Sequence, residues 1–502
     1  MLYILGGKYM YDRSSTKQKW TFMKYMRDFE QIIKYASAIR NYSSNISDYT
    51  LGKIQEEFEC KGIYNPRFGK RNLTTIECKT RQIVYFMFGY TKKINNKLKM
   101  VFSPLGNLLL DYQDNKEFVS KIFFTMLFSI EFKHPFNKMS DDFEVRPFRI
   151  IFKLLCDERL EGRLYNDEVF YYVSFLKKID SNIYEKLIKD ILSFRKLDCK
   201  EKFKLFKKDE EVLADSLHLW RYVCGTLEGA GILKNFKTDD KKYGNLNQGK
   251  STHRSYRYEY VKLNEDIVKF AKKMLLKYMY DEPVLMKNNE LMRTDIITQM
   301  YNFYPEELIS ELGIMNENQE ELLSILNITN KIEEYGKNIN NATCYKFEDI
   351  LTEAFNSFID VRAESIGGAG NTDIECKYFH DNTYTKFDIE AKSTNNKLNL
   401  INAGRLKRHR NLIGSQYTIV ITPDYVPSVK YDIVGSEIVI LKTRTLSNFL
   451  YQLSVKYNRN ISYKILNKII VNNLGKDITE CVDMYICEHL SSEIGECLLH
   501  NN

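Results

Sequence analysis

Acidic side chains and one lysine gather in the stretch Gly367–Ser393, which reads GGAGNTDIECKYFHDNTYTKFDIEAKS. Alternation along an extended strand puts Asp388, Glu390 and Lys392 on one face. Asp373 belongs to the preceding strand, which we expect to be the neighbour of this one in the sheet. Carboxylates that converge on one sheet edge repel each other unless a divalent cation lies between them, and such hard oxygen ligands suit Mg²⁺ or Mn²⁺. A lysine beside that ion can orient water or neutralise charge on a phosphoryl group. The pattern therefore predicts metal-assisted hydrolysis.

A further acid, Glu348, belongs to the amphipathic segment Tyr345–Ile359, in which Phe347, Leu351, Ala354, Phe355 and Phe358 share one helical face. Glu348 falls at the edge of that apolar face, whereas Glu353 is rotated towards water. An acid at a core-facing edge needs a cation or a metal as partner. The alternative is that Glu348 only complements the helix dipole near the N-terminus of the helix.

The elements expected around these residues form an α/β sheet. A glycine-rich turn leads into the first strand, the sequence HDNTY turns the chain, and TKFDIEAKST forms the second strand. The following segment, NNKLNLINAGRLKRHRNLIG, is a basic helix, and QYTIVITPDY returns as an apolar strand. Helix, two strands, helix and strand in this order predict a central sheet flanked by helices.

Positive charge is concentrated in the N-terminal half. Between Lys61 and Lys99 there are ten Lys and Arg residues and one acid, Glu77, with Tyr and Phe interleaved. Such a cluster is typical of a surface that binds a polyanion. A solvated basic face is the alternative.

Two segments in this half share one plan, an apolar-periodic helix followed by a strand, a basic turn and a strand. The first starts at Thr75 and the second at Leu217. This order is that of a winged helix, which reads DNA with its helix and contacts phosphates with its wing. A generic α+β hairpin is the alternative. The candidate DNA-binding residues of the chain are Arg67, Lys70, Arg71, Lys79, Arg81, Lys92, Lys93, Lys241, Lys242, Lys250, Arg254, Arg257, Arg405, Arg408 and Arg410.

Composition narrows the class of protein. The chain has 502 residues, a 44% hydrophobic fraction and a net charge of +8. It has no run of eighteen apolar residues and no signal-peptide pattern, so we expect neither a membrane span nor secretion. Its ten cysteines occur singly, which predicts free thiols in a reducing cytoplasm. The string GNLNQGKS matches a P-loop in letters, but no apolar strand precedes it and no helix follows.

The acidic arrangement resembles the PD-(D/E)xK nuclease superfamily. The matching residues are Asn371-Thr372-Asp373 and, after sixteen residues, Glu390-Ala391-Lys392, with Thr372 in place of the usual proline. The resemblance implies that Asp373, Glu390 and the carbonyl of Ala391 hold Mg²⁺, with Mn²⁺ as a substitute, and that Lys392 positions the attacking water. It also implies that Glu348 completes the shell directly or through water. Asp388 remains open as an alternative to Glu390, and Glu375 is expected to be a neighbour only.

The wider chain is similar to type IIS restriction endonucleases of the AlwI/PleI/MlyI group, which includes strand-nicking relatives. The string FKHPFNKMSDDFEVRPFRIIFKLLCDERLEGRLYNDEV carries much of this likeness. The resemblance implies binding to a short asymmetric site on double-stranded DNA and Mg²⁺-dependent cleavage a few bases to one side. It also implies a cognate DNA methyltransferase as genetic partner, and a transient dimer or a small catalytic subunit for cutting the second strand.

These inferences predict an α+β multidomain protein. Winged-helix-like DNA-recognition subdomains span 1–135 and 136–277, a helical linker spans 278–335, and an α/β PD-(D/E)xK nuclease domain with a central mixed sheet spans 336–502. Two alternatives remain open. One is a nicking endonuclease that cuts a single strand, and the other is a DNA-binding regulator whose nuclease-like domain is inactive.

Overall fold

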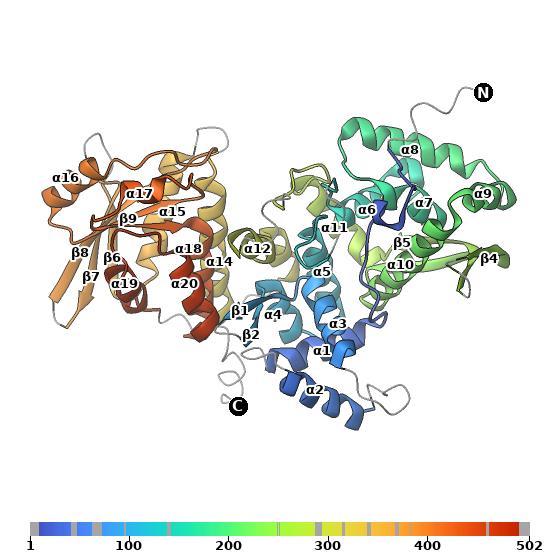
Figure 1. Ribbon diagram of the computed structural model, residues 1–502, viewed down its shortest axis with the longest axis horizontal. Helices are drawn as coiled ribbons and strands as arrows, with labels where there is room; N and C mark the ends of the chain where they lie inside the picture. The colour runs from blue at the N-terminus through green and yellow to red at the C-terminus, as the bar shows by residue number, and fades with distance from the viewer. Residues whose placement is uncertain are drawn as a thin grey trace. The chain divides into compact units, whose positions relative to one another are not determined.

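The computed structural model describes residues 10–41, 48–62, 73–94, 97–137, 142–247, 249, 252–286, 294–313, 317–338, 343–366, 371–381, 383–457 and 461–490. The chain divides into two compact units (Figure 1). The first comprises Met1–Thr91 and Phe102–Leu312, and the second comprises Lys92–Val101 and Gly313–Asn502. The division at Leu312 falls inside the range 278–335 that the sequence suggests as a linker. The four predicted domain ranges themselves stay predictions.

The chain up to Leu312 is mainly helical. Its helices are α1 (Phe29–Asn41), α2 (Asp48–Cys60), α3 (Leu73–Tyr85), α4 (Pro104–Asp111), α5 (Lys116–Phe128), α6 (Pro147–Cys156), α7 (Asn166–Tyr171), α8 (Ser181–Arg195), α9 (Cys199–Phe206), α10 (Glu210–Gly229), α11 (Glu265–Lys277), α12 (Thr294–Tyr301) and α13 (Glu306–Leu312). Its strands are β1 (Gly89–Ile94), β2 (Lys97–Phe102), β3 (Leu164–Tyr165), β4 (Leu233–Asn247) and β5 (His253–Leu263).

Both predicted helix–hairpin segments are present. Helix α3 leads into the antiparallel hairpin β1–β2, and α10 leads into β4–β5. Helix α10 forms because its apolar side chains recur at helical spacing, and Trp220 lies fully buried within it. The string GNLNQGKS begins with Gly244–Asn247 at the end of β4, and the next element is β5 from His253, so no helix follows it, as its context indicated. Whether the two segments bind DNA as winged helices do stays a prediction.

In the sequence, acidic and apolar residues alternate at helical spacing from Ser140 to Ile179, with Pro147 as a helix start signal, which predicts helix. The described residues of this segment are only partly helical. Pro147 begins α6 as expected, because proline fits the first helical position. The chain then turns through Glu161 and Gly162, both with positive φ, and adds the short strand β3 to the edge of β5. The expectation of continuous helix was wrong here, since the strand pairing joins residues about a hundred positions apart and leaves no local periodic signal.

The second unit is built around a five-stranded mixed sheet. Its strands are β6 (Val361–Ser365), β7 (Ile374–His380), β8 (Thr383–Ala391), β9 (Thr418–Thr422) and β10 (Ile438–Lys442), in the spatial order β10-β9-β8-β7-β6. The pairs β6–β7 and β7–β8 are antiparallel, and β8–β9 and β9–β10 are parallel. The predicted α+β class and mixed C-terminal sheet are confirmed.

Helices cover both faces of this sheet (Figure 1). The larger apolar core lies on one face and includes residues of α14 (Glu317–Gly336), α15 (Cys344–Asn356), α18 (Thr443–Lys456), α19 (Lys464–Val471) and α20 (Thr479–Tyr485). A smaller core on the other face joins α16 (Ala403–Ile413) and α17 (Val429–Asp432) to Val420, Ile438 and Ile440. Alternation along β8 therefore divides its side chains between two environments.

Two expectations that concern compartment can be compared with the structure. Among the described residues, no helix is both long and apolar enough to cross a lipid bilayer. The nine cysteines that the structure describes are all free thiols, and Cys497 lies outside the described residues. The predicted absence of disulfides therefore holds for those nine.

Candidate functional site

The candidate site lies where β7 begins and β8 ends, because these antiparallel strands pair with Ile374 opposite Ile389. Phe387 and Ile389 point into the larger core, so the side chains of Asp388 and Glu390 lie on the opposite face, as predicted. Asp373 directly precedes β7 and also lies on that face. Its carboxylate Oδ2 accepts a hydrogen bond of 2.7 Å from the backbone N–H of Ala391. Asp373 is thereby held beside the end of β8.

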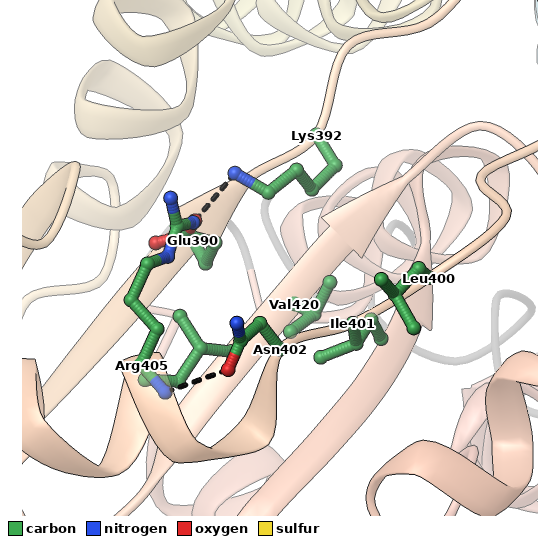
Figure 2. A pocket seen from close by; sticks show the side chains of 8 residues that line it. Glu390, Lys392, Leu400, Ile401, Asn402, Arg405 and Val420 are labelled. Carbon is green, nitrogen blue, oxygen red and sulfur yellow. Dashed lines mark hydrogen bonds and ion pairs between the residues drawn. The ribbon is translucent and has the colours of Figure 1, made fainter.

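Glu390 is the most buried acid of this group and has two cationic partners. Its side chain is 2% exposed, and its Oε1 is paired with both Lys392 Nζ and Arg405 Nη2. Figure 2 shows Lys392 and Arg405 converging on the Glu390 carboxylate. The other oxygen, Oε2, is buried and has no hydrogen-bond partner among the residues that the structure describes. A buried carboxylate oxygen without a partner is costly, which marks it as a position for a ligand.

The acids of the site influence one another. Burial raises the pKa of Asp373 above its usual range, and the neighbouring charge of Glu390 raises it further, while Lys392 opposes both. Burial, followed by the charges of Asp373 and Asp349, likewise raises the pKa of Glu348. Glu348 lies on α15, where Phe347 and Leu351 are buried and Glu353 is exposed, as the helical periodicity predicts. Helix α15 therefore holds Glu348 close enough to the ends of β7 and β8 for the charges of Asp373 and Glu390 to act on it.

A divalent cation can be tested against these donors. Among the described residues, no three His, Cys, Asp or Glu side chains form a ready-made group able to hold an ion. The expected direct contribution of Glu348 therefore lacks support in the structure, and its role through water stays a prediction. Asp373, the unpartnered Oε2 of Glu390 and the carbonyl of Ala391 remain, and Mg²⁺ is commonly held by one or two carboxylates with waters completing its octahedron. This donor set fits Mg²⁺.

Asp388, the alternative acid, is placed differently. It is fully buried between two hydroxyls, with Thr372 Oγ1 donating to Oδ2 at 3.2 Å and Thr418 Oγ1 donating to Oδ1 at 3.2 Å. Burial raises the pKa of Asp388 to about 7. Both of its oxygens thus have partners within the protein, unlike those of Glu390. This difference favours Glu390 for ligand contact. Thr372, which stands where the PD-(D/E)xK pattern has proline, has a contact of its own with Asp388.

Glu375 already has a partner within the sheet, and its expected role as a neighbour rather than a ligand stays a prediction. It lies opposite Asp388 in the β7–β8 ladder and forms an ion pair of 2.6 Å with Lys386.

The predicted DNA-binding residues of the second unit differ in their exposure to solvent. Arg405 and Arg408 are exposed on α16, whereas Arg410 is buried, pairs with Glu437 and donates to Thr418 Oγ1 at 3.4 Å. The prediction for Arg410 needs correction, because an arginine enclosed between a carboxylate and a hydroxyl cannot reach a phosphate. The role of Arg405 as the partner of Glu390 was missed, since a cation fifteen residues away gives no local signal.

In the first unit, one prediction is likewise corrected. Lys79 is buried and donates to the hydroxyl of Tyr35 at 2.6 Å, so it is not available to DNA. Arg81 and the wing residues Lys241 and Lys242 are exposed. Arg67, Lys70, Arg71 and Lys250 lie outside the described residues, and the side chain of Lys93 is not described. Lys92, in the segment that groups with the second unit, is partly exposed.

Sequence reasoning missed a concentration of positive charge along α10. Here called the α10 basic stripe, it consists of Lys24, Arg27, His218, Arg221 and Arg254. Burial, then the charges of Arg254 and Lys24, lower the pKa of His218 to about 4, although Asp215 opposes this. Arg254 Nε is buried and has no hydrogen-bond partner among the described residues. The Arg27 side chain lies directly over Gly225, where a Cβ would collide with it.

The stripe combines three segments distant in sequence, namely the chain before α1, helix α10 and strand β5. His218, Arg221 and Gly225 recur at helical spacing on the half-exposed side of α10. The segment before α1 is tied to this helix, because Thr226 Oγ1 donates to the carbonyl of Arg27 at 3.2 Å. Asp215 and Glu259 offset part of this charge, and Glu259 lies 3.5 Å from Arg221 Nη2. Excess cations on one helix face suit an extended polyanion.

Comparisons with known proteins define the class. Residues 15–278 match the family model described as the N-terminal domain of the type II restriction endonuclease HgaI. Over 471 residues the chain is 44% identical to the type II restriction enzyme HgaI of Avibacterium volantium. The match covers 92% of this chain and 96% of that protein. The chain therefore belongs to the type II restriction endonucleases, which are site-specific deoxyribonucleases, and within them to the HgaI family.

Solved structures also show similarity. The DNA-binding domain of the BpuJ1 endonuclease, in complex with modified DNA, matches with a TM-score of 0.33 and 14% identity, covering 53% of this chain and 87% of that one. The restriction endonuclease FokI, alone and bound to DNA, matches with a TM-score of 0.27 and 11% identity, covering 90% of this chain and 99% of that one. The predicted resemblance to restriction endonucleases is confirmed, and its narrower assignment to the AlwI/PleI/MlyI group stays a prediction.

Proposed function

We propose that this restriction endonuclease hydrolyses DNA in a Mg²⁺-dependent reaction at the end of β8, with Mn²⁺ as an effective substitute. The observation that carries the proposal is that two acids influence each other at this strand end. Asp373 feels the charge of Glu390, and the buried Oε2 of Glu390 has no partner among the described residues, while Lys392 binds its Oε1. Asp373, Glu390 and the carbonyl of Ala391 would hold the ion. When bound, Mg²⁺ supplies charge that lowers the pKa of water and stabilises the phosphoryl oxygens.

The residues of the chain then have separate tasks. Asp373 is held in place by the Ala391 N–H, which donates to its Oδ2, and it would share the ion with Glu390. Lys392, which is one-third exposed, would orient the attacking water and neutralise charge that develops on the phosphate. Glu348, whose pKa is raised by its surroundings, would accept a proton from water at the edge of the site. Asp388 would support Glu390 from within the sheet.

Recognition of DNA is proposed for the first unit. The α10 basic stripe and the exposed cations of the β4–β5 hairpin supply positive charge on adjacent elements. Arginine can read guanine edges in the major groove, and lysines position the protein on phosphates. Because the recognition and hydrolytic residues lie in different units, we further propose type IIS behaviour, namely cleavage outside a short asymmetric site. A cognate methyltransferase would protect the host DNA, and a second copy or a small subunit would cut the other strand.

The decisive experiment compares Asp373→Asn with Asp381→Asn on supercoiled plasmid, with and without Mg²⁺. Asp381 lies in the turn between β7 and β8 and its side chain is 98% exposed, so its replacement controls for loss of an acid in the same hairpin. We expect D373N to lose at least about a thousandfold in cleavage rate while retaining specific DNA binding in Ca²⁺, because a metal ligand acts mainly on the chemical step. D381N should cleave like the wild type.

Sequencing the product ends tests the finer parts of the proposal. Ends at a fixed distance outside one sequence support type IIS cleavage, and nicked circles alone would indicate a strand-specific nicking enzyme. Wild-type cleavage by D373N would contradict the assignment of the site.

A further inference from the structure

Glu390 is held by two cations that differ in their freedom to move. Lys392 lies two residues after Glu390 in the sequence. Arg405 reaches Glu390 from the first turn of α16. The Arg405 side chain is 45% exposed, against 2% for Glu390. Its backbone is fixed, because Asn402 caps the helix by accepting a hydrogen bond of 2.9 Å from the Arg405 N–H. The guanidinium can therefore leave Glu390 while its helix stays in place.

Both cations bind the same oxygen of Glu390. Oε1 accepts from Lys392 and Arg405, and Oε2 has no partner among the described residues. This arrangement leaves Oε2 available to an ion. An incoming divalent cation would bring two positive charges close to a carboxylate that already has two. Like charges at such short range oppose each other strongly in a partly buried site.

The space around these groups can accommodate the exchange. A pocket of about 200 Å³ is lined by Glu390, Lys392, Arg405, Asn402 and apolar residues of the smaller core (Figure 2). This volume is large enough for several water molecules, so the Arg405 guanidinium has open space beside Glu390 into which it can move. The exposed side of Arg405 opens from this pocket to solvent.

We propose that Arg405 acts as an exchange residue. In the protein without metal it neutralises Glu390, and it is displaced when a divalent cation binds beside Asp373 and Glu390. The freed guanidinium then contacts the DNA phosphate, where it can donate two parallel hydrogen bonds, one to each non-bridging oxygen. This inference rests on the proposed metal-dependent function. It makes Arg405 a positioning residue that couples ion binding to phosphate binding.

The proposal predicts that one substitution strengthens metal binding and slows DNA cleavage. Arg405→Gln removes the competitor, so we expect Mn²⁺ to bind the DNA-free full-length protein roughly fivefold more tightly, the scale expected for one exposed ion pair. The same variant should cleave DNA at least about tenfold more slowly in single turnover, since the phosphate contact is lost. Arg405→Lys keeps the charge and should return Mn²⁺ affinity towards the wild-type value. Free Mn²⁺ measured by electron paramagnetic resonance gives the affinity without any need for catalysis.

Lys407→Gln is the matched control. Lys407 is exposed on the same helix, and two residues of separation rotate it by about 200° from Arg405. Its loss removes one positive charge without touching Glu390, so Mn²⁺ affinity should not change. Unchanged or weaker Mn²⁺ binding by R405Q would overturn the exchange role and leave Arg405 as a structural support for Glu390. If D373N and the wild type bind Mn²⁺ equally, the proposed metal site itself fails, which is a distinguishable result.

Discussion

Three acids on one sheet face, Asp373, Asp388 and Glu390, have three different environments. Asp388 is enclosed by the hydroxyls of Thr372 and Thr418, whereas Glu390 has cations on one oxygen and nothing on the other among the described residues. Asp373 is anchored by a backbone N–H. Neighbours, and not residue type, therefore decide which acid can hold an ion. The same holds in the first unit, where His218 is surrounded by cations.

His218 allows a pH prediction at the level of a single residue. Its pKa is lowered to about 4 by burial and by Arg254 and Lys24, so the folded protein resists protonation while the unfolded chain takes up a proton near pH 6.5. The stabilising contribution of the neutral His218 is fully present above about pH 6.5 and is lost as the pH falls towards 4. We expect wild-type stability to drop relative to His218→Gln by on the order of 1–2 kcal/mol between pH 7.5 and 5, after discounting for partial exposure.

Urea unfolding at the two pH values measures this difference. The variant His253→Gln is the control, because His253 is exposed at the start of β5. A constant stability difference between wild type and H218Q across this range would show that His218 is not held neutral by its surroundings.

At the scale of elements, antiparallel and parallel pairing place the functional side chains. The β7–β8 register puts Ile374 opposite Ile389, and the parallel β8–β9 register puts Asp388 beside Thr418. A shift of one residue in either pair would turn the acids into the apolar core. In the first unit, α10 and β5 together present the α10 basic stripe.

Arg254 on β5 tests the stripe as a DNA-binding surface. If it contacts a phosphate, Arg254→Gln should lower the slope of log affinity against log salt by about one, because one fewer counterion is released on binding. Lys262→Gln removes the same charge from the exposed far end of the same strand and should leave the slope unchanged. Fluorescence anisotropy in Ca²⁺ over a range of NaCl concentrations measures both. Equal slopes for R254Q and wild type would exclude a phosphate contact by Arg254.

At the scale of the whole molecule, the proposed DNA recognition and the proposed hydrolysis belong to different units. The α10 basic stripe lies in the unit that ends at Leu312, and Asp373, Glu390 and Lys392 lie in the unit that begins again at Gly313. Recognition and hydrolysis by different units predict that the cut position depends on the connection between them, whereas the recognised sequence does not.

Insertion of Gly-Ser-Gly-Ser after Gly313 tests this dependence. We expect the recognition sequence to stay the same and the cleavage offsets to spread over several positions, because the longer flexible connection widens the reach of the second unit. Sequencing of product ends from a plasmid library gives both quantities. A loss of sequence preference, with the offset unchanged, would contradict the assignment of recognition to the first unit.

The sequence by itself determined the elements that carry the site. Periodicity of two along β7 and β8, and of 3.6 along α15, predicted the faces of Asp388, Glu390 and Glu348, because these patterns follow from backbone geometry over a few neighbouring residues. The helix–hairpin order of both N-terminal segments was predicted for the same reason.

Only the tertiary structure decided which charged side chains meet. Arg405 pairs with Glu390, Arg410 and Lys79 are buried, and Lys24 approaches His218. Each contact joins elements whose pairing or packing is set by long-range register, which leaves no trace in local spacing. Whether a cation is exposed or is already neutralised depends on the acid or hydroxyl that another element supplies, and this explains why equally basic positions have different roles.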